Sequence, residues 1–398
     1  MSTIRVAIAG ATGYAGEELI RLLLQHPHVQ LTHLAASAKW ERPTSVAEVY
    51  PRFARQLDLP VEALDRGRLI GAADAVFLAL PHGTAMALVP SLLEAGKRVI
   101  DLSGDFRLRD PSLYPQWYQF THAHPELLSQ DGLAYGLTEF HRDAIRKARL
   151  VANPGCYATS ILLGVLPLFQ AKLVEDGRFL VDAKSGLSGA GRKAETGLLF
   201  TEMTENLRAY KVNQHPHMPE VLQELERAAG VRPLMGFVPQ VIPVTRGLIS
   251  MLYVRTRATP EAVAAAYRAA YPEDRAPFVR VRPSGTLPQL RDVVGTNFCD
   301  VGFHYDPSLG TLIVDSALDN LIFTAQISQQ NLFGRGQSLN LKADIGSRTT
   351  NYELSFIEPW LFDIPLWSKF DIWDMSRSYD AYDLDSMGAG FTLGYPLW

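Results

Sequence analysis

The sequence predicts an α/β fold that is followed by a C-terminal segment of a different, all-β kind. Residues 4–9 form an apolar, strand-like run that enters a glycine-rich turn and then a helix-like pattern. Further apolar runs, each followed by a small or turn-forming segment, continue this alternation. After about residue 321 the apolar period changes from 3.6 residues to 2. We therefore expect an α/β part with a doubly wound sheet and a strand-rich tail.

Composition narrows the class of protein and the kind of partner. A chain of 398 residues is too long for one ordinary core and predicts two or three domains. The net charge of -4, without runs of Lys or Arg, disfavours nucleic acid and anionic membrane surfaces, so we expect a small-molecule partner. The only two cysteines cannot build a disulfide framework, and the N-terminus shows no export signal. These features predict free thiols and a cytoplasmic location.

The turn after the first strand has the spacing GxxGxxG. Between a strand and a helix, such glycines let the backbone approach a pyrophosphate, where unpaired N–H groups favour negative charge. The pattern predicts a dinucleotide site, and its alternative is a tight strand-to-helix turn that binds nothing. The residues predicted to bind the cofactor here are Gly10, Thr12, Gly13, Tyr14, Ala15 and Gly16.

The end of the second strand bears on the choice of cofactor. An acidic residue there would bind the ribose 2′-hydroxyl of NAD, but this chain has Ser37 and Lys39 instead. A hydroxyl and a cation favour the 2′-phosphate of NADP, although Lys39 could simply be solvated. Pro81–Gly83 and Ser103–Arg107 follow two further strands and should flank the cofactor, because ligands bind beyond the carboxyl ends of parallel strands.

Cys156 follows Asn153-Pro154-Gly155 and begins an apolar helix-like run. A sulfur at a helix N-terminus is favoured as the thiolate, since the dipole and the free amides stabilise negative charge. This position predicts a nucleophile, and the alternative is a buried, inert cysteine.

A proton carrier for this thiol is available in the segment HPHMPE. His215 and His217, with Glu220 behind them, precede a helix-like run. A zinc site would need a third ligand, which is not present at the usual spacing, and surface histidines that cap a helix are the other alternative. A loop of small residues that ends in Arg192 could admit an anionic substrate. Together these parts predict reductive dephosphorylation of an acyl phosphate through a cysteine thioester.

The order and number of motifs give a specific resemblance. Residues 1 to about 320 resemble the N-acetyl-gamma-glutamyl-phosphate reductases of arginine biosynthesis, which are related to aspartate-semialdehyde dehydrogenase. The matching stretches are VAIAGATGYAGEEL, FLALPHG, DLSGDFRL, YGLTEF, VANPGCYAT, KSGLSGAGR, HPHMPE, PVTRGL, LPQLRDVVGTNFCDVGF and VDSALDNL. The resemblance implies an NADP-binding Rossmann domain, an α+β catalytic domain built on a mixed sheet, and assembly as a dimer or tetramer.

The resemblance also implies roles for single residues. Cys156 would form the acyl-enzyme, and His217 would be the acid/base, supported by His215 and Glu220. Substrate contacts would come from Arg107, Asn153, Arg192 and Tyr210, and cofactor contacts from Pro81, Ser188 and Gly189. The implied reaction is reduction of N-acetyl-glutamyl 5-phosphate to the semialdehyde with NADPH. The alternatives are the same chemistry on another acyl phosphate, aspartyl or carrier-linked, an inactive chimera, or a nucleotide-binding module without catalysis.

The tail breaks the family pattern. Leu339, Leu341, Ala343 and Ile345 alternate with polar residues, and four of the six tryptophans lie after residue 359. This segment resembles part of the outer-membrane barrel of the Omp85 superfamily of assembly factors, with about four strands. A barrel fragment on a reductase predicts a fusion, in the gene or in the assembled sequence. The rival is a genuine tail that docks on another protein or on a membrane.

The expected domain boundaries follow from these patterns. Residues 1–152 would form the Rossmann domain, to which residues 311–321 return, and residues 153–310 would form the catalytic and dimerisation domain. Residues 322–398 would be the barrel-like fragment.

Overall fold

The computed structural model describes residues 3–192, 195–230, 233–319, 329–332, 337–345, 349–358, 367–378 and 383–394. The chain forms two compact units, Met1–Thr324 and Ala325–Trp398, and this division lies close to the one predicted at residue 322. Among the described residues, no helix combines the length and the apolar character needed to cross a membrane.

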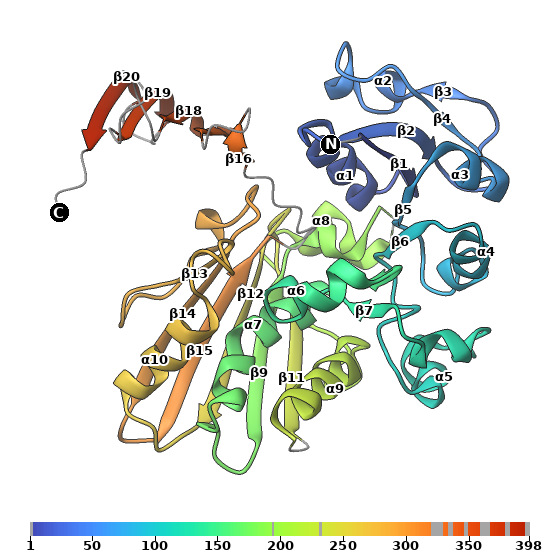
Figure 1. Cartoon of the computed structure of the whole chain (residues 1–398). Helices are drawn as coiled ribbons and strands as arrows, with labels where there is room; N and C mark the ends of the chain where they lie inside the picture. Colours follow the sequence, from blue (N-terminus) through green and yellow to red (C-terminus); the bar gives the residue numbers. More distant parts are fainter. Residues whose placement is uncertain are drawn as a thin grey trace. The chain divides into compact units, whose positions relative to one another are not determined.

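The first unit begins with an eight-stranded sheet in the order β3-β4-β2-β1-β5-β6-β8-β7 (Figure 1). Every pair in it is parallel except β3 with β4. The strands are β1 (Ile4–Ala9), β2 (Val29–Ala35), β3 (Thr44–Ser45), β4 (Pro60–Glu62), β5 (Ala75–Leu78), β6 (Arg98–Asp101), β7 (Leu133–Tyr135) and β8 (Leu150–Ala152). The strand order reverses beside β1, which places a crevice beyond its carboxyl end.

Short helices connect the strands of this first sheet. They are α1 (Tyr14–Leu24), α2 (Val46–Val49), α3 (Arg66–Ala72), α4 (Val89–Glu94), α5 (Tyr114–Tyr118) and α6 (Thr138–Lys147). The predicted strand, glycine turn and helix are therefore present as β1 and α1.

A mixed seven-stranded sheet forms the second half of this unit, in the order β10-β11-β9-β12-β15-β14-β13. Its strands are β9 (Arg178–Ser185), β10 (Arg208–Ala209), β11 (Leu234–Val241), β12 (Leu248–Arg255), β13 (Val279–Val281), β14 (Cys299–Asp306) and β15 (Thr311–Leu318). Its helices are α7 (Cys156–Gln170), α8 (Phe200–Met203), α9 (His217–Ala229) and α10 (Pro260–Ala270). The predicted α/β fold with a mixed-sheet second domain is confirmed.

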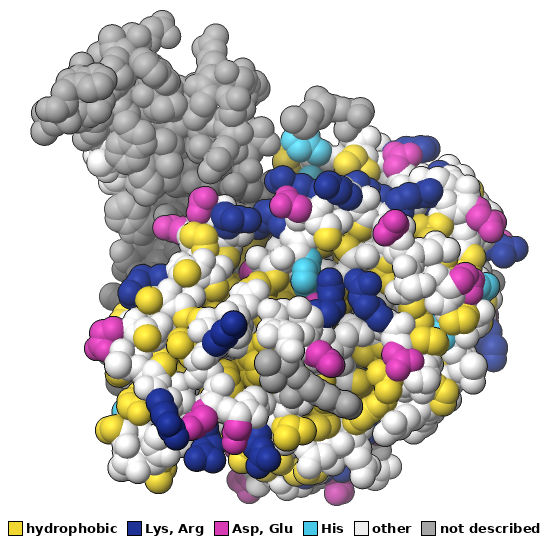
Figure 2. Space-filling view, turned by 60° about the horizontal axis from the view of Figure 1, so that its bottom comes forward, with side chains coloured by type: hydrophobic (Ala, Val, Ile, Leu, Met, Phe, Trp, Pro, Cys, Tyr) yellow, Lys and Arg dark blue, Asp and Glu magenta, His cyan; other side chains and the backbone are white. Residues whose placement is uncertain are grey.

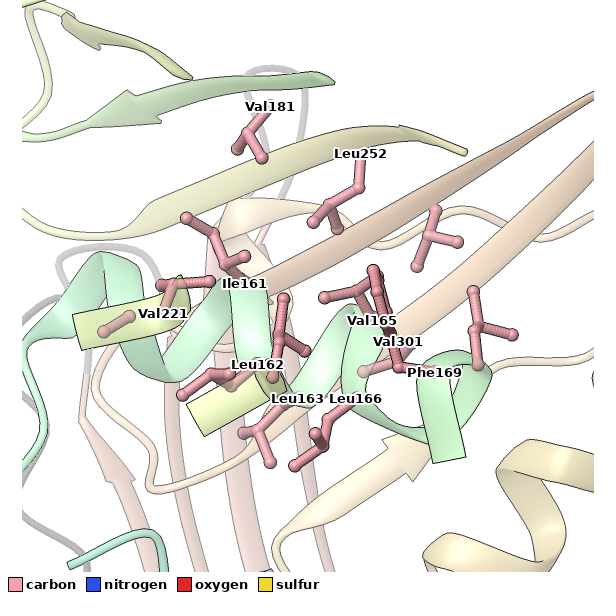
Figure 3. Close-up of a cluster of buried hydrophobic side chains, with 14 of the residues drawn as sticks. Ile161, Leu162, Leu163, Val165, Leu166, Phe169, Val181, Val221, Leu252 and Val301 are labelled. Carbon is pink, nitrogen blue, oxygen red and sulfur yellow. The ribbon is translucent and has the colours of Figure 1, made fainter. Parts of the chain in front are cut away.

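Helix α7 is the centre of the second core. All of its residues from Tyr157 to Phe169 are buried. Figure 3 shows Ile161 and Val165 among the sheet residues Val181, Leu252 and Val301. Each fully buried large apolar side chain contributes about 1.5–3 kcal/mol to folding, so this packing fixes the helix and, with it, the position of Cys156 at its N-terminus.

The prediction that residues 311–321 return to the first sheet is wrong for the described residues 311–319. Strand β15 lies inside the second sheet, between β12 and β14. A turn of a few residues joins β14 to β15, so the two strands pair as an antiparallel hairpin. Residues 320 and 321 lie outside the described residues.

The second unit contains a five-stranded antiparallel sheet in the order β16-β17-β18-β19-β20. Its strands are β16 (Gln329–Leu332), β17 (Gln337–Ile345), β18 (Thr349–Glu358), β19 (Trp367–Ser378) and β20 (Asp383–Gly394). The sequence predicts about four strands in this segment, one fewer than the described sheet contains.

Charges are mixed on the molecular face shown in Figure 2. Lysine and arginine side chains there are interspersed with aspartate and glutamate. A mixed face of this kind does not present the single-sign field that a nucleic-acid backbone would need.

Candidate active site

Cys156 stands where the chain passes from the first sheet to the second. Strand β8 ends at Ala152, and α7 begins at Cys156 with the extended Gly155 as its N-cap. No side chain caps this helix, so the backbone N–H groups of its first turn point unbonded by a cap toward the end of the helix that carries Cys156. The Cys156 side chain is half-buried, which leaves it reachable for a substrate.

Burial decides the protonation of this thiol. It raises the pKa of Cys156 to about 11, although the N–H of Tyr157 and the Arg107 guanidinium oppose it. The expectation that the helix N-terminus favours the thiolate in the free protein is therefore wrong, because desolvation outweighs the helix amides. The thiol is protonated at neutral pH and needs a base to become a nucleophile.

His217 lies against this turn and is a candidate base for the thiol. It is the first residue of α9, and a Cβ built on Gly155 would lie 2.1 Å from its Nε2. Only a glycine at position 155 lets the imidazole lie this close to the backbone that precedes Cys156. The ring of His215 lies 4.6 Å from that of His217, and its Nδ1 accepts the backbone N–H of His217 at 3.2 Å.

Both imidazoles are neutral in this environment. Burial lowers the pKa of His215 to about 3, with Lys211 and Arg107 acting in the same direction. Burial also lowers the pKa of His217 well below its usual value, and the nearby cations add to this effect. A neutral His217 can accept the thiol proton, which is the role expected of the base.

A buried ion pair holds these groups in place. Glu220 is completely buried, and its Oε1 accepts the Tyr135 hydroxyl at 2.7 Å and the Gly155 N–H at 2.9 Å. Its Oε2 lies 3.6 Å from Nη1 of Arg107, which lies 3.4 Å from His217 Nε2. Burial raises the pKa of Glu220, while Arg107 and the two hydrogen bonds oppose the rise. The carboxylate thus fixes the N-cap of the helix that carries Cys156.

Arg107 has its donors engaged in this arrangement. It is 6% exposed, its Nε donates to the Asn153 carbonyl at 2.8 Å, and its Nη2 donates to the Leu102 carbonyl at 2.8 Å. Arg107 therefore positions His217 and Glu220, and its predicted contact with the substrate stays a prediction. Asn153 supplies its backbone oxygen to this network, and its side chain stays near Pro154.

The predicted dinucleotide turn has the geometry that its glycines suggest. Gly10 has φ +88°, and a Cβ there would lie 2.1 Å from the Ala79 oxygen. A Cβ on Gly16 would lie 2.3 Å from the Gly10 oxygen. Gly13 differs, because a Cβ there would meet only the Gly10 oxygen, at 3.5 Å. The protein itself requires Gly10 and Gly16, whereas the open side of Gly13, the N-cap of α1, fits a bound pyrophosphate.

Other predicted cofactor residues lie at the same edge of the first sheet. Ser37 and Lys39 are exposed just after β2, and Pro81 is exposed shortly after β5. Thr12, Tyr14 and Ala15 are half-buried in the turn and the first turn of α1. These predicted cofactor residues thus follow the carboxyl ends of β1, β2 and β5, and their contact with a cofactor stays a prediction.

A cavity of about 420 Å³ lies beside this turn. It is lined by Tyr14, Ser188 and Arg192 among others. Gly189 lies with Ser188 in the short helical turn Leu187–Ala190. Arg192 stacks 4.8 Å over the Tyr14 ring and pairs with Glu17 at 3.0 Å. These contacts place Arg192 with the glycine-rich turn, and its substrate contact stays a prediction.

Tyr210 lies on the catalytic side. Its ring is 5.7 Å from that of His215, and burial raises its pKa to about 12. Among the described residues, no group of three His, Cys, Asp or Glu side chains is arranged to hold a metal ion.

Three further residues of this region support the site: His82 and Asp105 lie in the two stretches predicted to flank the cofactor, whereas Tyr135 lies in neither stretch. Tyr135 orients Glu220, and Asp105 accepts the N–H groups of Gly83 and Met86 at 2.7 and 3.0 Å. His82 accepts the Gly104 N–H at 2.8 Å. The motifs PHG and DLSGDFRL contain two of these residues, but nothing in the sequence pairs Tyr135 with a glutamate 85 positions later.

Comparison with known proteins agrees with this geometry. N-acetyl-gamma-glutamyl-phosphate reductase of Symbiobacterium thermophilum is 45% identical over 323 residues, which is 80% of this chain and 91% of that protein. The same-named protein of Nitrosococcus oceani is 43% identical over 342 residues, 85% of this chain and 98% of that protein. The chain belongs to this family.

Two family models cover the reductase part. Residues 5–148 match the NAD binding domain of semialdehyde dehydrogenases, and residues 156–320 match their dimerisation domain. The cofactor of the reductase part is therefore a nicotinamide dinucleotide. An aspartate semialdehyde dehydrogenase II from Vibrio cholerae has the same fold, with a TM-score of 0.59, 19% identity, and coverage of 80% of this chain and 94% of that one.

The tail matches a different family. Residues 331–398 match the model of the Omp85 superfamily domain. The predicted composition of the chain, a reductase part followed by an Omp85-like segment, is confirmed.

Proposed function

We propose that this chain reduces N-acetyl-glutamyl 5-phosphate to N-acetyl-glutamate 5-semialdehyde with NADPH and releases phosphate. The observation that carries this proposal is the placement of Cys156 at the start of α7 with His217 against Gly155. The identity to the reductases named above supplies the substrate.

The chemistry on the protein side begins at the thiol. His217 accepts the Cys156 proton as sulfur attacks the acyl carbon, so that the C–S bond forms while the bond to phosphate breaks. The result is a thioester and inorganic phosphate. A reduced nicotinamide cofactor, held at the glycine-rich turn from Gly10 to Gly16, would supply the hydride that reduces the thioester carbon. The C–S bond of the resulting thiohemiacetal then breaks and the semialdehyde is released. His217 gives its proton back to the Cys156 sulfur, which restores the thiol.

The remaining predicted residues support this chemistry. His215 and Tyr210 line the approach to His217, while Glu220 and Arg107 hold the base and the helix terminus in register. Gly10 to Gly16 would hold the pyrophosphate, and Ser37 with Lys39 would hold the 2′-phosphate of NADP. A higher kcat/KM with NADPH than with NADH is the expected result, and a preference for NADH would contradict the choice of NADP.

We also propose that the reductase part works as a homo-oligomer in the cytoplasm. Residues of β9 and β12 that face away from α7 form an uncovered sheet face, where Leu180 is 61% exposed. The dimerisation domain in the matching family model supports a second copy as the occupant of this face. Sedimentation equilibrium of the chain without residues 325–398 should give a dimer or tetramer, and a monomer would contradict this.

The tail is proposed to be a fusion that takes no part in the reaction. Relatives that match 91% of their own length account for only 80% of this chain, and the rest matches an unrelated domain. Long-read sequencing across codons 319–331 tests the fusion, because one uninterrupted reading frame in the source DNA would argue for a genuine tail.

The decisive assay is phosphate-dependent NADP reduction with N-acetyl-glutamate semialdehyde. Cys156→Ala should lower kcat/KM at least about 10³-fold, because no other group replaces the nucleophile. Cys299→Ala is the matched control, since Cys299 is buried against Ser316 at 3.3 Å and should keep the activity. Equal activity of the Cys156 variant and the wild type would reject the thioester mechanism, and activity only with aspartate semialdehyde would reject the substrate.

A further inference from the structure

The two halves of the first unit share the cavity beside the glycine-rich turn. Among its lining residues, Tyr14, Glu17 and Arg52 come from the first half, and Ser188 and Arg192 come from the second. The predicted cofactor residues therefore belong to two segments that lie far apart in the chain. A cofactor that contacts both segments binds only when they stand in register, so the contacts that join them bear on its affinity.

The segment from the second half is attached by backbone hydrogen bonds to the loop between β11 and β12. The N–H groups of Leu187 and Ser188 donate to the carbonyls of Val244 and Thr245, at 2.9 and 3.0 Å. Gly191 follows with φ +80°, in the left-handed region that favours glycine. After this turn the next residue, an arginine, contacts the first half of the unit.

Arg192 makes three contacts across the two halves. Its Nη2 donates to Oε2 of Glu17 at 3.0 Å. Its guanidinium carbon lies 4.8 Å from the centroid of the Tyr14 ring and 5.1 Å from that of the Tyr50 ring. Both distances are within the range of about 6 Å in which an aromatic face attracts a cation. One side chain of the second half is therefore held by a carboxylate and two aromatic rings of the first.

The three partners of this guanidinium belong to the glycine-rich turn or support it. Tyr14 directly follows Gly13, the N-cap of α1, and the Glu17 N–H donates to the Gly13 carbonyl at 2.9 Å. Tyr50 is 4% exposed, and its hydroxyl donates to the carbonyls of Ala11 and Gly13 at 3.2 and 3.3 Å. The guanidinium is thus fixed to the backbone that is predicted to bind the pyrophosphate.

We propose that Arg192 is a positioning residue for the nicotinamide cofactor, which holds the segment with Ser188 and Gly189 against the glycine-rich turn. This inference rests on the proposed function and deepens it. It gives Arg192 a role at the cofactor turn in place of the predicted contact with the substrate. Contacts that keep the two segments in register raise the fraction of molecules that can bind the cofactor, and the affinity rises with that fraction.

The test measures cofactor binding to the full-length protein without the reaction. Titration calorimetry gives the Kd of NADPH and, separately, that of NADH. Arg192→Ala should raise the Kd of the tighter-binding dinucleotide at least about fivefold, because fewer molecules hold the two segments in register. Arg192→Lys should recover part of the loss, since an ammonium can pair with Glu17 but lacks the planar stacking of a guanidinium. The Arg192 side chain is 43% exposed, so both variants should keep the melting temperature of the wild type.

Arg52→Ala is the matched control. Arg52 lines the same cavity, and its Nη1 lies 3.4 Å from Oε1 of Glu17, but both residues of this pair belong to the first half. This variant should leave the Kd within about twofold of the wild-type value, because it breaks no contact between the halves. Equal effects of Arg52→Ala and Arg192→Ala would overturn the proposal, and so would an unchanged Kd in Arg192→Ala.

A double-mutant cycle separates positioning from a direct contact between Arg192 and a phosphate of the cofactor. Tyr14→Leu removes one of the rings on which the guanidinium stacks. If Arg192 acts through the turn, Arg192→Ala should raise the Kd by a smaller factor in the Tyr14→Leu background than in the wild type. The same factor in both backgrounds would mean that Arg192 acts independently of this ring, which would overturn the positioning role.

Initial rates separate this proposal from the proposed function. Arg192→Ala should raise the KM for the oxidised cofactor and leave the KM for N-acetyl-glutamate semialdehyde within about twofold. A rise in the semialdehyde KM alone would support the predicted substrate contact and overturn the positioning role. Loss of NADPH affinity in a protein without reductase activity would support the positioning role and reject the function, whereas activity with an unchanged Kd would support the function and reject the positioning role.

Discussion

The second sheet of the reductase part buries the apolar side chains of one face, whereas the sheet of the tail leaves such side chains exposed. Helix α7 covers one face of the second sheet, and residues such as Val181 and Leu252 are at most 1% exposed. In the tail, Phe370 and Phe391 are paired across β19 and β20, on one face, and are 40% and 62% exposed. Met387 shares this face and is 81% exposed. Similar alternating sequences therefore give a core in one case and an open apolar surface in the other.

The difference shows what a strand pattern leaves undetermined. Alternation fixes which residues share a face, but a helix or another sheet must cover that face before burial can stabilise it. The uncovered face of the second sheet is intermediate between these extremes, because it combines Leu180 with the charged pair Asp182 and Lys184. Three classes of surface thus occur on one chain, and each can be tested separately.

The largest effect is expected from removing the tail. Deletion of residues 325–398 takes away exposed apolar groups and the outer edges of β16 and β20, which pair with no further strand among the described residues. Both features promote association. Sedimentation velocity should show species that grow with concentration for the full chain and one discrete species for the shortened chain. Activity per active site should stay within about twofold, since the catalytic residues all lie in the first unit.

Two outcomes would break the comparison. Concentration-dependent association that is the same with and without the tail would show that its open face is not the cause. Loss of reductase activity on deletion would show that the tail belongs to the enzyme.

A smaller effect on stability is expected in the glycine-rich turn, where it distinguishes a glycine that the fold requires from one that faces a ligand. Gly10→Ala should cost about 2–5 kcal/mol, because φ +88° is strained for alanine and its Cβ would overlap the Ala79 backbone. Gly13→Ala should change stability by less than about 0.5 kcal/mol and raise the KM for the cofactor about tenfold, because its methyl group faces the pyrophosphate side. Denaturant melts and initial rates measure the two quantities.

The paired design also decides between the two interpretations of the turn. A tight turn that binds nothing predicts that Gly13→Ala leaves the cofactor KM unchanged. Equal destabilisation by both variants would show that the turn is not built as the structure describes.

Much of the reductase fold could be predicted from the sequence because its signals are local. Apolar periodicity and nearby glycine or proline residues predict the strand, turn and helix at residues 4–24. They also predict the helix that begins at Cys156. The placement of residues 311–319 could not be predicted in this way, since an apolar strand carries no mark of the sheet it joins. That choice depends on the pairing partners, β12 and β14.

The reacting groups of the candidate site can be predicted from the sequence, but the residues that orient them cannot. Cys156, His217 and Glu220 stand in short motifs, but Tyr135 meets Glu220 only through the tertiary fold. The protonation of Cys156 was mispredicted for a similar reason, since helix position is visible in the sequence and burial is not. The distant partners of a motif, and its solvent exposure, decide its electrostatics.

The smallest effect concerns a buried carboxylate on the side of the second sheet that faces away from α7. Asp315 of β15 is 3% exposed, and its Oδ1 has no hydrogen-bond partner among the described residues. Burial raises its pKa to about 6 from 3.8, with Lys184 acting in the opposite direction. The native state then binds more protons than the unfolded state between these values. Stability should therefore fall as pH rises from about 4 to 6 and stay lower above 6.

Asp315→Asn should remove this loss, because the amide carries no charge to bury. The variant should be about 1–3 kcal/mol more stable than the wild type at pH 8 and gain little at pH 4, as measured by denaturant melts at both pH values. Asp182→Asn on the same face is the control, and it should lower stability at pH 8 because it breaks the pair with Lys184 at 2.5 Å. An equal gain for Asp315→Asn at both pH values would mean that the shape of the side chain matters there and its charge does not.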